Sequence, residues 1–222
     1  MSATAGAPVT VPKSRTKVVL FVIFLVLTVF VTYMKNRGFF DSESPVSKRF
    51  APVLTFLLVH GLFAATALLI GILQFSNRLR ARHLALHRTL GYIYITCVFI
   101  GAPFAVPVAA GLTPGSLVAA SVAQTLGWTI STAIALYCVR MGNIVQHRRW
   151  MIRGYAFALV FTTARLIIPI PPILAMGELG IEIVVWSCIV AAGFLPTIFL
   201  DWRAITKRPA RKQTMAMALE EA

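Results

Sequence analysis

The sequence predicts an all-α fold: a polytopic membrane helix bundle of six transmembrane helices, with the N-terminus and the C-terminus both in the cytoplasm. Of its 222 residues, 58% are hydrophobic and 13% are charged, whereas roughly a quarter of the residues in a soluble domain are charged. The apolar residues form runs close to the ~20 residues that a helix needs to cross a bilayer. The chain has 21 Lys and Arg against 7 Asp and Glu, and most of these basic residues lie between the apolar runs. Such alternation is typical of a membrane protein oriented by its positive charges.

The first two apolar runs predict two spans joined by a polar loop. Val18 to Met34 is uncharged and has basic residues on both sides. It is long for a signal-peptide core and no small-residue cleavage site follows it, so we expect an uncleaved signal anchor. Phe50 to Phe75 is the second predicted span, and His60 is its one ionisable side chain. The first basic loop, Asn77 to Arg88, comes next.

The third and fourth predicted spans share the longest stretch without charge. No Asp, Glu, Lys or Arg occurs at positions 89–139, which is too long for one span. A Gly-Leu-Thr-Pro-Gly sequence divides this stretch with turn-forming residues. We therefore expect a third span at residues 89–110 and a fourth at residues 116–139. Pro103 and Pro107 should bend the third span in its second half, because proline has no N–H for the helical ladder.

A second basic loop precedes the last two predicted spans. It runs from Arg140 to Arg153. The fifth span, at about residues 154–170, is interrupted by Arg165 and ended by prolines, and the sixth ends near Leu200. The predicted organisation is therefore a cytoplasmic segment at residues 1–17, a transmembrane domain at residues 18–200 and a basic cytoplasmic tail at residues 201–222.

The distribution of basic residues predicts the orientation. Sixteen of the 21 Lys and Arg lie in the N-terminal segment, the two basic loops and the tail, and four lie in the loop after the first span. Six spans put the first group of segments on one side of the membrane, and the excess of positive charge marks that side as cytoplasmic. We expect a multi-pass protein of the cell membrane, in the bacterial inner membrane, with the lipid bilayer as a partner. Since orientation explains the basic residues, we expect no nucleic-acid binding.

Three histidines are predicted to lie at the cytoplasmic surface of the bundle. His83 and His87 are four residues apart and would share one face of a helix that begins there. His147 belongs to the second basic loop, on the same side. Neutral imidazoles that meet at this surface could ligate haem iron or another metal. The simpler alternative, which spacing alone favours, is that they bind lipid phosphates or helix ends.

A second group of polar residues is predicted inside the membrane. At 1.5 Å per residue, His60 lies roughly 22 Å from the cytoplasmic end of its helix and Arg165 lies roughly 18 Å from the start of its own. They should therefore fall at similar depth. An intramembrane cation normally faces a partner or a watery cavity, so Arg165 could pair with a glutamate or bind an anion. His60 could equally donate a structural hydrogen bond to a neighbouring helix. The other residues of this predicted site are Gln124, Glu178 and Glu182.

Several segments resemble the motifs of one protein family. His87 to Tyr94 resembles an H-R-x-L-G-x-x-Y motif, and Gln146 to Arg153 matches a Q-H-x-x-W-M-x-R motif. The family is an uncharacterised group of bacterial membrane proteins, a predicted membrane domain of unknown function. The resemblance covers Val53 to Leu200 and extends to Thr163-Ala164-Arg165, His60-Gly61 and Gln74-Phe75.

The histidine layout of this family is similar to that of membrane b-type cytochromes and ferric-reductase-like domains, which hold haem between histidines of neighbouring helices. The fourth span contains no His here, so the resemblance implies one haem b rather than two. His87 and His147 would be its axial ligands. The propionates of the haem would meet Arg88, Arg149 or Arg153.

These observations leave several functions open. The first hypothesis is an electron carrier resembling a single-haem b-type cytochrome, with a quinone or another redox partner. The second is a transporter or small-anion channel that uses the polar residues inside the membrane. The third is a metal-dependent lipid-modifying enzyme, in which His83 would add a ligand. The fourth is a membrane assembly factor without a cofactor.

Overall fold

The computed structural model describes residues 43–113 and 115–206, together with isolated positions between 22 and 41. Within these residues the regular structure is helical and no strand occurs, which confirms the all-α prediction. Most of the first predicted span, Val18 to Met34, lies outside the described residues, and its described positions are helical. The predicted N-terminal segment and most of the predicted tail also lie outside the described residues.

The second predicted span corresponds to helix α3, Leu54–Gln74. It follows the short helix α2, Pro45–Phe50, and the 3-10 turn η2, Ala51–Val53. Ser44 caps α2, because its Oγ accepts a backbone N–H at 3.0 Å. Pro45 then occupies the first helical position, where a missing N–H breaks no helical hydrogen bond.

The third predicted span is built from two helices that follow a short one. Helix α4, Asn77–Arg82, lies in the first basic loop and is capped by Ser76. Helix α5, Leu84–Gly101, begins five residues before the predicted start of the span, and α6, Ala105–Leu112, completes it. Pro107 lies in the first turn of α6, where proline is tolerated.

The break at Pro103 confirms one part of the prediction from sequence, whereas α6 runs through Pro107 without a break. At the break between α5 and α6, the oxygen of Ala102 accepts the N–H of Ala105 at 3.1 Å, a tighter turn than the regular α-helical hydrogen bond. His60 Nδ1 donates to the oxygen of Gly101 at 2.8 Å, and Thr125 Oγ1 donates to the oxygen of Ala102 at 3.0 Å. Side chains from two neighbouring helices thus satisfy the bent backbone, which lipid cannot do. His60 therefore makes the structural hydrogen bond that the sequence left open.

Replacing Thr125 with valine is expected to lower the free energy of unfolding by about 1 kcal/mol, because the carbonyl oxygen at the bend loses a donor from another helix. The measurement is unfolding of the purified protein by sodium dodecyl sulfate in mixed micelles. Thr129→Val is the matched control, since the hydroxyl of Thr129 donates to carbonyl oxygens of its own helix. Equal effects of the two substitutions would contradict this account of the bend.

The fourth predicted span matches helix α7, Gly115–Arg140, but the segment after it differs from the prediction. The expected basic loop from Arg140 to Arg153 is only a turn at residues 141–143, in which Gly142 has a φ of 73°. Helix α8, Ile144–Ile167, begins ten residues before the predicted fifth span. The prediction was wrong because it assigned charged residues to a loop. A helix can carry Arg into the headgroup layer, where the long side chain reaches water.

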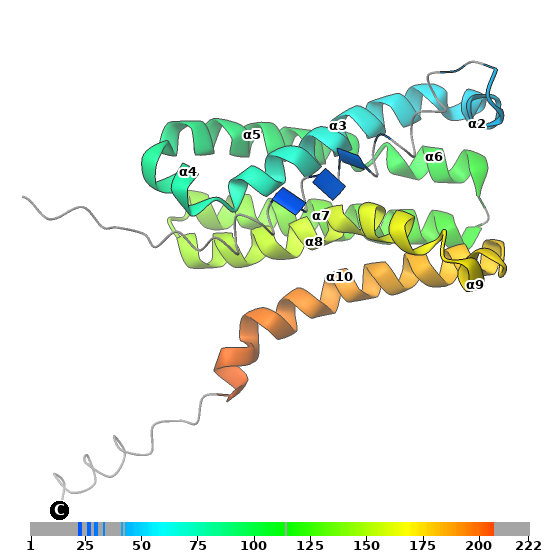
Figure 1. Ribbon diagram of the computed structural model, residues 1–222. Helices are drawn as coiled ribbons and strands as arrows, with labels where there is room; N and C mark the ends of the chain where they lie inside the picture. Colours follow the sequence, from blue (N-terminus) through cyan, green and yellow to red (C-terminus); the bar gives the residue numbers. More distant parts are fainter. Residues whose placement is uncertain are drawn as a thin grey trace, which may run out of the picture.

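The chain continues through the short helix α9, Pro171–Leu174, into the long helix α10, Glu178–Thr206. Helix α10 extends six residues beyond the predicted end of the sixth span. It contains Pro196, which removes one donor from its hydrogen-bond ladder. In Figure 1 α10 diverges from the other helices toward its C-terminal end, although Thr197 and Asp201 still contact α8.

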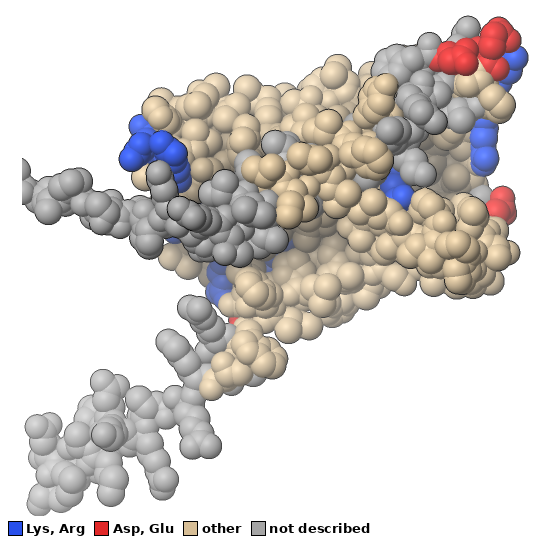
Figure 2. Space-filling view, in the orientation of Figure 1, with Lys and Arg blue, Asp and Glu red and all other residues tan. Residues whose placement is uncertain are grey.

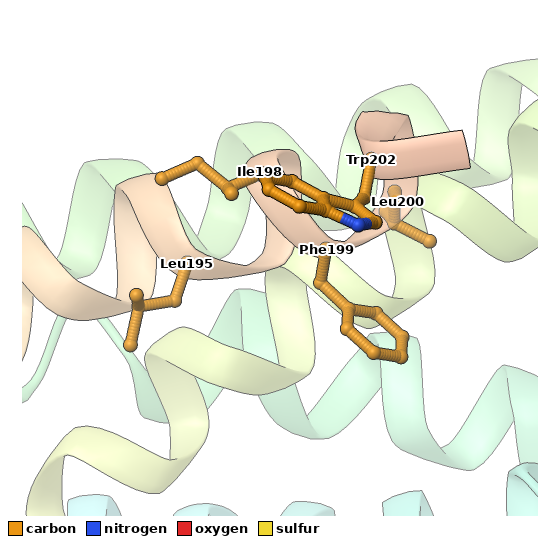
Figure 3. A pocket seen from close by; sticks show the side chains of 5 residues that line it. All are labelled: Leu195, Ile198, Phe199, Leu200 and Trp202. Atoms are coloured by element: carbon orange, nitrogen blue, oxygen red, sulfur yellow. The ribbon is translucent and has the colours of Figure 1, made fainter. Parts of the chain in front are cut away.

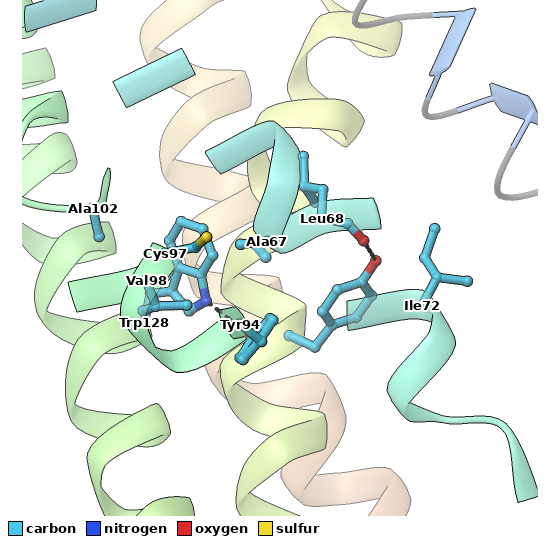
Figure 4. Close-up of a cluster of buried hydrophobic side chains, with 10 residues drawn as sticks. Ala67, Leu68, Ile72, Tyr94, Cys97, Val98, Ala102 and Trp128 are labelled. Carbon is cyan, nitrogen blue, oxygen red and sulfur yellow. Dashed lines mark hydrogen bonds between the residues drawn. The ribbon is translucent and has the colours of Figure 1, made fainter. Parts of the chain in front are cut away.

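Two antiparallel pairs of helices, α3 with α5 and α7 with α8, form the centre of the bundle, and α10 packs against α8 and α7 (Figure 1). Buried aromatic residues join the pairs (Figure 4). Trp128 Nε1 donates to the hydroxyl of Tyr94 at 3.1 Å, and the hydroxyl of Tyr155 donates to the oxygen of Leu68 at 2.8 Å. Each polar atom of these rings thus has a partner inside the apolar core.

The surface of the bundle is that of a membrane protein. In Figure 2 the visible charged side chains lie mostly toward the two ends, and an uncharged surface separates them. The C-terminal half of α10 borders a shallow, open hollow of about 750 Å³ with apolar side chains, among them Phe199, which is 77% exposed (Figure 3). Four helical segments within the described residues are long and apolar enough to cross a bilayer: residues 47–74, 84–112, 115–140 and 178–202.

Candidate functional site

The first component of the site is His147, in the first turn of α8. Asn143 caps this helix, because its side chain accepts the N–H of Gln146 at 3.1 Å. His147 Nδ1 lies 2.9 Å from the carbonyl oxygen of Ala135 in α7. A carbonyl oxygen only accepts, so Nδ1 carries a hydrogen, and in the neutral tautomer with this hydrogen Nε2 has the lone pair. This hydrogen bond fixes the ring between α7 and α8.

His87 lies in the first turn of α5, close enough to His147 for an electrostatic interaction. Its Nδ1 is buried and has no hydrogen-bond partner among the described residues. One turn further along α5, Gly91 brings the backbone near the side-chain oxygen of Gln74. The amide nitrogen of Gln74 is likewise buried without a partner in this part of the chain. Two predicted histidines therefore interact electrostatically, and Gln74, which the sequence did not assign to the site, lies near Gly91, one turn along α5 from His87.

His83 lies apart from this pair. It is exposed, directly before α5, and its carbonyl oxygen accepts the N–H of His87 at 3.0 Å. Within the described residues no group of three or more His, Cys, Asp or Glu side chains is arranged to hold a metal ion. The described structure thus offers a pair of imidazoles and does not add His83 to it.

Arg149 and Arg153 lie on a different face of α8, toward α10. Both form ion pairs with Asp201, in which Arg149 donates to one carboxylate oxygen and Arg153 lies 3.7 Å from the other. Arg153 also donates to Thr197 at 3.1 Å. These two cations therefore hold α10 against α8 and point away from His147. Sequence analysis missed Asp201, although a single acid at the end of the last span facing two cations one turn apart was a usable signal.

Other cations surround the histidine pair instead. Arg80 of α4 and Arg148 of α8 interact electrostatically with each other and with His87, and Arg88 follows His87 directly. Partial burial, and then the positive charge of Arg148, lower the pKa of Arg80 from its ordinary value. Arg80 also donates to the side-chain oxygen of Asn77. This end of the bundle, which the sequence predicts to be cytoplasmic, thus combines two imidazoles with several guanidinium groups.

The predicted polar site inside the membrane is only partly assembled. His60 interacts electrostatically with Arg165, in keeping with a similar depth for the two residues. Arg165 lies in the last turn of α8, and its guanidinium carbon is 4.0 Å from the centre of the Phe161 ring. Gln124 donates to the oxygen of Phe157 at 3.2 Å and so links α7 to α8. At the start of α10, Glu178 is exposed and Glu182 is half-buried.

Comparison with protein families identifies the chain. The model of a family described as "Predicted membrane protein (DUF2306)" matches residues 57–200. The chain belongs to this family. The match confirms the family resemblance inferred from the sequence motifs. In this DUF2306 protein the family match covers every predicted site residue and ends directly before Asp201. No curated protein and no solved structure shows significant similarity to the chain.

Proposed function

We propose that this integral membrane protein spans the cell membrane six times, with both termini in the cytoplasm, and carries electrons through one b-type haem. In the proposed arrangement the haem iron is held by His87 and His147 at the cytoplasmic ends of α5 and α8. A quinone or another membrane redox component would be the electron partner. Membrane character is established by the family and by the apolar helices; the haem and the topology are our proposals.

The packing of α8 supports its assignment as a further span. It has 24 residues, which corresponds to roughly 36 Å at 1.5 Å per residue. It lies between α7 and α10, and both of these helices are long and apolar enough to cross a bilayer. The length of α8 and its position between two apolar helices support the proposal that it is a further span. With Val18 to Met34 as the first span, the count reaches six, and the positive charges favour cytoplasmic termini.

The observation that supports the haem proposal is that His87 and His147, in the first turns of α5 and α8, lie near enough to interact electrostatically. Haem-binding histidines commonly donate one ring nitrogen to a carbonyl and ligate iron through the other. His147 has this arrangement, since Nδ1 donates to Ala135 and Nε2 makes no hydrogen bond within the described part of the chain. The buried Nδ1 of His87, which lacks a protein partner there, fits a site completed by a ligand. When bound, a haem accepts and returns single electrons.

The roles of the surrounding residues follow from their positions. Ala135 orients His147 through its backbone oxygen, and Gln74 lies near Gly91, one turn along α5 from His87. Arg88 remains our candidate partner for a propionate, because it follows His87 directly. Arg149 and Arg153 are engaged by Asp201, so we assign them to packing of α10 instead.

The test is an absorption spectrum of the full-length protein, purified in detergent from cells supplied with a haem precursor. We expect a Soret band that corresponds to about one haem per chain. His87→Ala and His147→Ala should each lose most of this band. His83→Ala, which removes an exposed histidine one turn away, should keep it.

A second variant separates loss of ligation from loss of folding. His147→Gln keeps a side chain that can donate to Ala135 but offers no imidazole, so it should fold and still lack the band. Size-exclusion chromatography checks that each variant is monodisperse. A colourless wild-type protein, or a full Soret band in either alanine variant, would refute the proposal.

A further inference from the structure

An open apolar groove lies between α8 and α10 on the surface of the bundle. Helix α8 lines it with Ile152, Ala156 and Leu159, which recur every three or four residues and therefore share one face. Helix α10 lines it with Leu195 and Phe199, which extend from the same side of this helix in Figure 3. The groove has a volume of about 520 Å³ and shares these two residues with the hollow on α10. The two hollows therefore form one continuous groove.

A charged cluster lies at the end of the groove that the sequence predicts to be cytoplasmic. Arg149 lies one turn before Ile152 on α8, and its guanidinium group donates to Asp201. Arg153 lies 3.7 Å from the other oxygen of this carboxylate. The sequence has no Asp or Glu at positions 44–177, and Asp201 is its one acid at positions 183–219. Two cations thus share one carboxylate, which leaves one positive charge in excess.

Arg149 has donors left for a ligand. Within the described chain, its hydrogen bonds to Asp201 and to the oxygen of Leu200 both come from one terminal nitrogen. A guanidinium group has five N–H donors, and the side chain of Arg149 is 30% exposed. The guanidinium carbon of Arg153 lies 4.9 Å from the centre of the Trp150 ring, and tryptophan is typical of the headgroup layer. The excess charge therefore lies at the level of lipid phosphates.

The length of the groove matches one leaflet of a bilayer. Arg149 and Leu159 are ten residues apart on α8, which corresponds to roughly 15 Å along the helix. The hydrocarbon core of a bilayer is roughly 30 Å thick, so each leaflet contributes about half of this distance. A cation followed by an apolar groove of one leaflet's depth is complementary in charge and in length to a phospholipid.

We propose that one anionic phospholipid of the cytoplasmic leaflet binds between α8 and α10, with its phosphate against Arg149 and an acyl chain along the groove. Guanidinium groups bind phosphate through charge-assisted hydrogen bonds. The cytoplasmic leaflet supplies anionic headgroups. Arg149 and Arg153 lie on a different face of α8 from His147, so this site does not rest on the proposed haem. The bound lipid would fill the space that opens where α10 diverges from the bundle.

The experiment measures thermal unfolding of the full-length protein in uncharged detergent, with dioleoyl phosphatidylglycerol or with dioleoyl phosphatidylcholine. A ligand that binds only the folded protein raises the unfolding midpoint, and we expect phosphatidylglycerol to raise it by roughly 5 °C at saturation. Phosphatidylcholine, which has the same acyl chains but no net charge, should raise it by less than half as much. Native mass spectrometry should then find phosphatidylglycerol retained on the chain.

Two substitutions in the charged cluster should change the response to phosphatidylglycerol in opposite directions. Arg149→Gln should lose at least half of the rise, because the phosphate loses its guanidinium partner. Asp201→Asn should enlarge the rise although it lowers the midpoint without lipid, because the carboxylate no longer competes with the phosphate for the two arginines. A merely structural cluster would lower the starting midpoint in both variants and leave the response to lipid unchanged, which would overturn the proposal.

A second pair of substitutions tests the groove. Leu195→Trp fills it and should lose most of the rise, whereas Phe194→Trp, at an exposed neighbouring position that does not line the groove, should keep it. Equal responses to the two phospholipids would contradict the proposal. So would a dimer in detergent that Leu195→Trp dissociates, because a second copy would then occupy the groove. If neither lipid acts and Leu195→Trp destabilises far more than Phe194→Trp, the chain itself covers the groove and the proposal is wrong.

Discussion

Gly71→Ala is expected to lower the free energy of unfolding by about 2 kcal/mol, the usual range for overpacking a core being roughly 1–3 kcal/mol. A Cβ at this position in α3 would lie 2.3 Å from Cε2 of Tyr155 and 3.1 Å from Cε2 of Tyr94. Neither distance allows an ordinary carbon contact. The ring of Tyr155 cannot move aside cheaply, because its hydroxyl donates to the buried oxygen of Leu68. The added methyl group must therefore separate α3 from α8.

The control for this substitution lies in the same helix. A Cβ at Gly61 would meet nothing within 4 Å, so Gly61→Ala should be neutral or stabilise the protein by up to about 1 kcal/mol through helix propensity. Unfolding by sodium dodecyl sulfate in mixed micelles measures both. If the Gly71→Ala and Gly61→Ala variants had the same free energy of unfolding, α3 would not approach the two tyrosines as closely as described here.

Asp201→Asn is expected to lower the free energy of unfolding by about 2 kcal/mol, which is typical for a hydrogen-bonded charge removed from a partly buried site. The carboxylate neutralises Arg149 and Arg153, whose side chains are 30% and 16% exposed. Asparagine has a similar shape but no charge, so two cations one turn apart would face each other without compensation. Amide hydrogen exchange should also rise in the C-terminal half of α10, because this cluster ties that half to α8.

An exposed ion pair supplies the comparison. Lys48 Nζ lies 2.8 Å from Glu43 Oε2, and the two side chains are 62% and 82% exposed, respectively. Water screens such a pair, so Glu43→Gln should change the free energy of unfolding by less than about 0.5 kcal/mol. The role assigned to Asp201 requires the larger loss. Equal, small effects of the two substitutions would mean that α10 is held by apolar packing alone.

The sequence was sufficient to predict the helical class, the four apolar helices and the bend at Pro103. Each of these depends on local properties: a run of apolar residues or a missing N–H. The start of α8 was misplaced because charge was used as a marker of loops. In the structure, Gln146 to Arg153 continues the helix beyond the apolar layer, and only residues 141–143 form the turn.

The candidate site shows the same limit. That His87 and His147 lie at the same end follows from counting spans, and the structure brings them together. Which arginines accompany them depends on the rotation of α8, which cannot be known until its start is known. Two residues along a helix correspond to about 200°, so Arg149 faces away from His147 toward α10. The ion pairs of Asp201 with α8 could not be predicted, because they depend on how helices that are distant in sequence pack together.

The short turn between α7 and α8 has a consequence for biosynthesis. Under the proposed topology α8 must become membrane-embedded although it carries Arg153 and Arg165, and a lone segment of this composition partitions reluctantly from the translocon into lipid. Because only residues 141–143 separate the two helices, α8 leaves the ribosome directly after α7. The hydrogen bonds of Gln124 to Phe157 and of His147 to Ala135, which join α7 and α8, can then form as soon as both helices have been synthesised. The two helices can thus enter the membrane together as one helical hairpin, in which the more apolar α7 favours the insertion of α8.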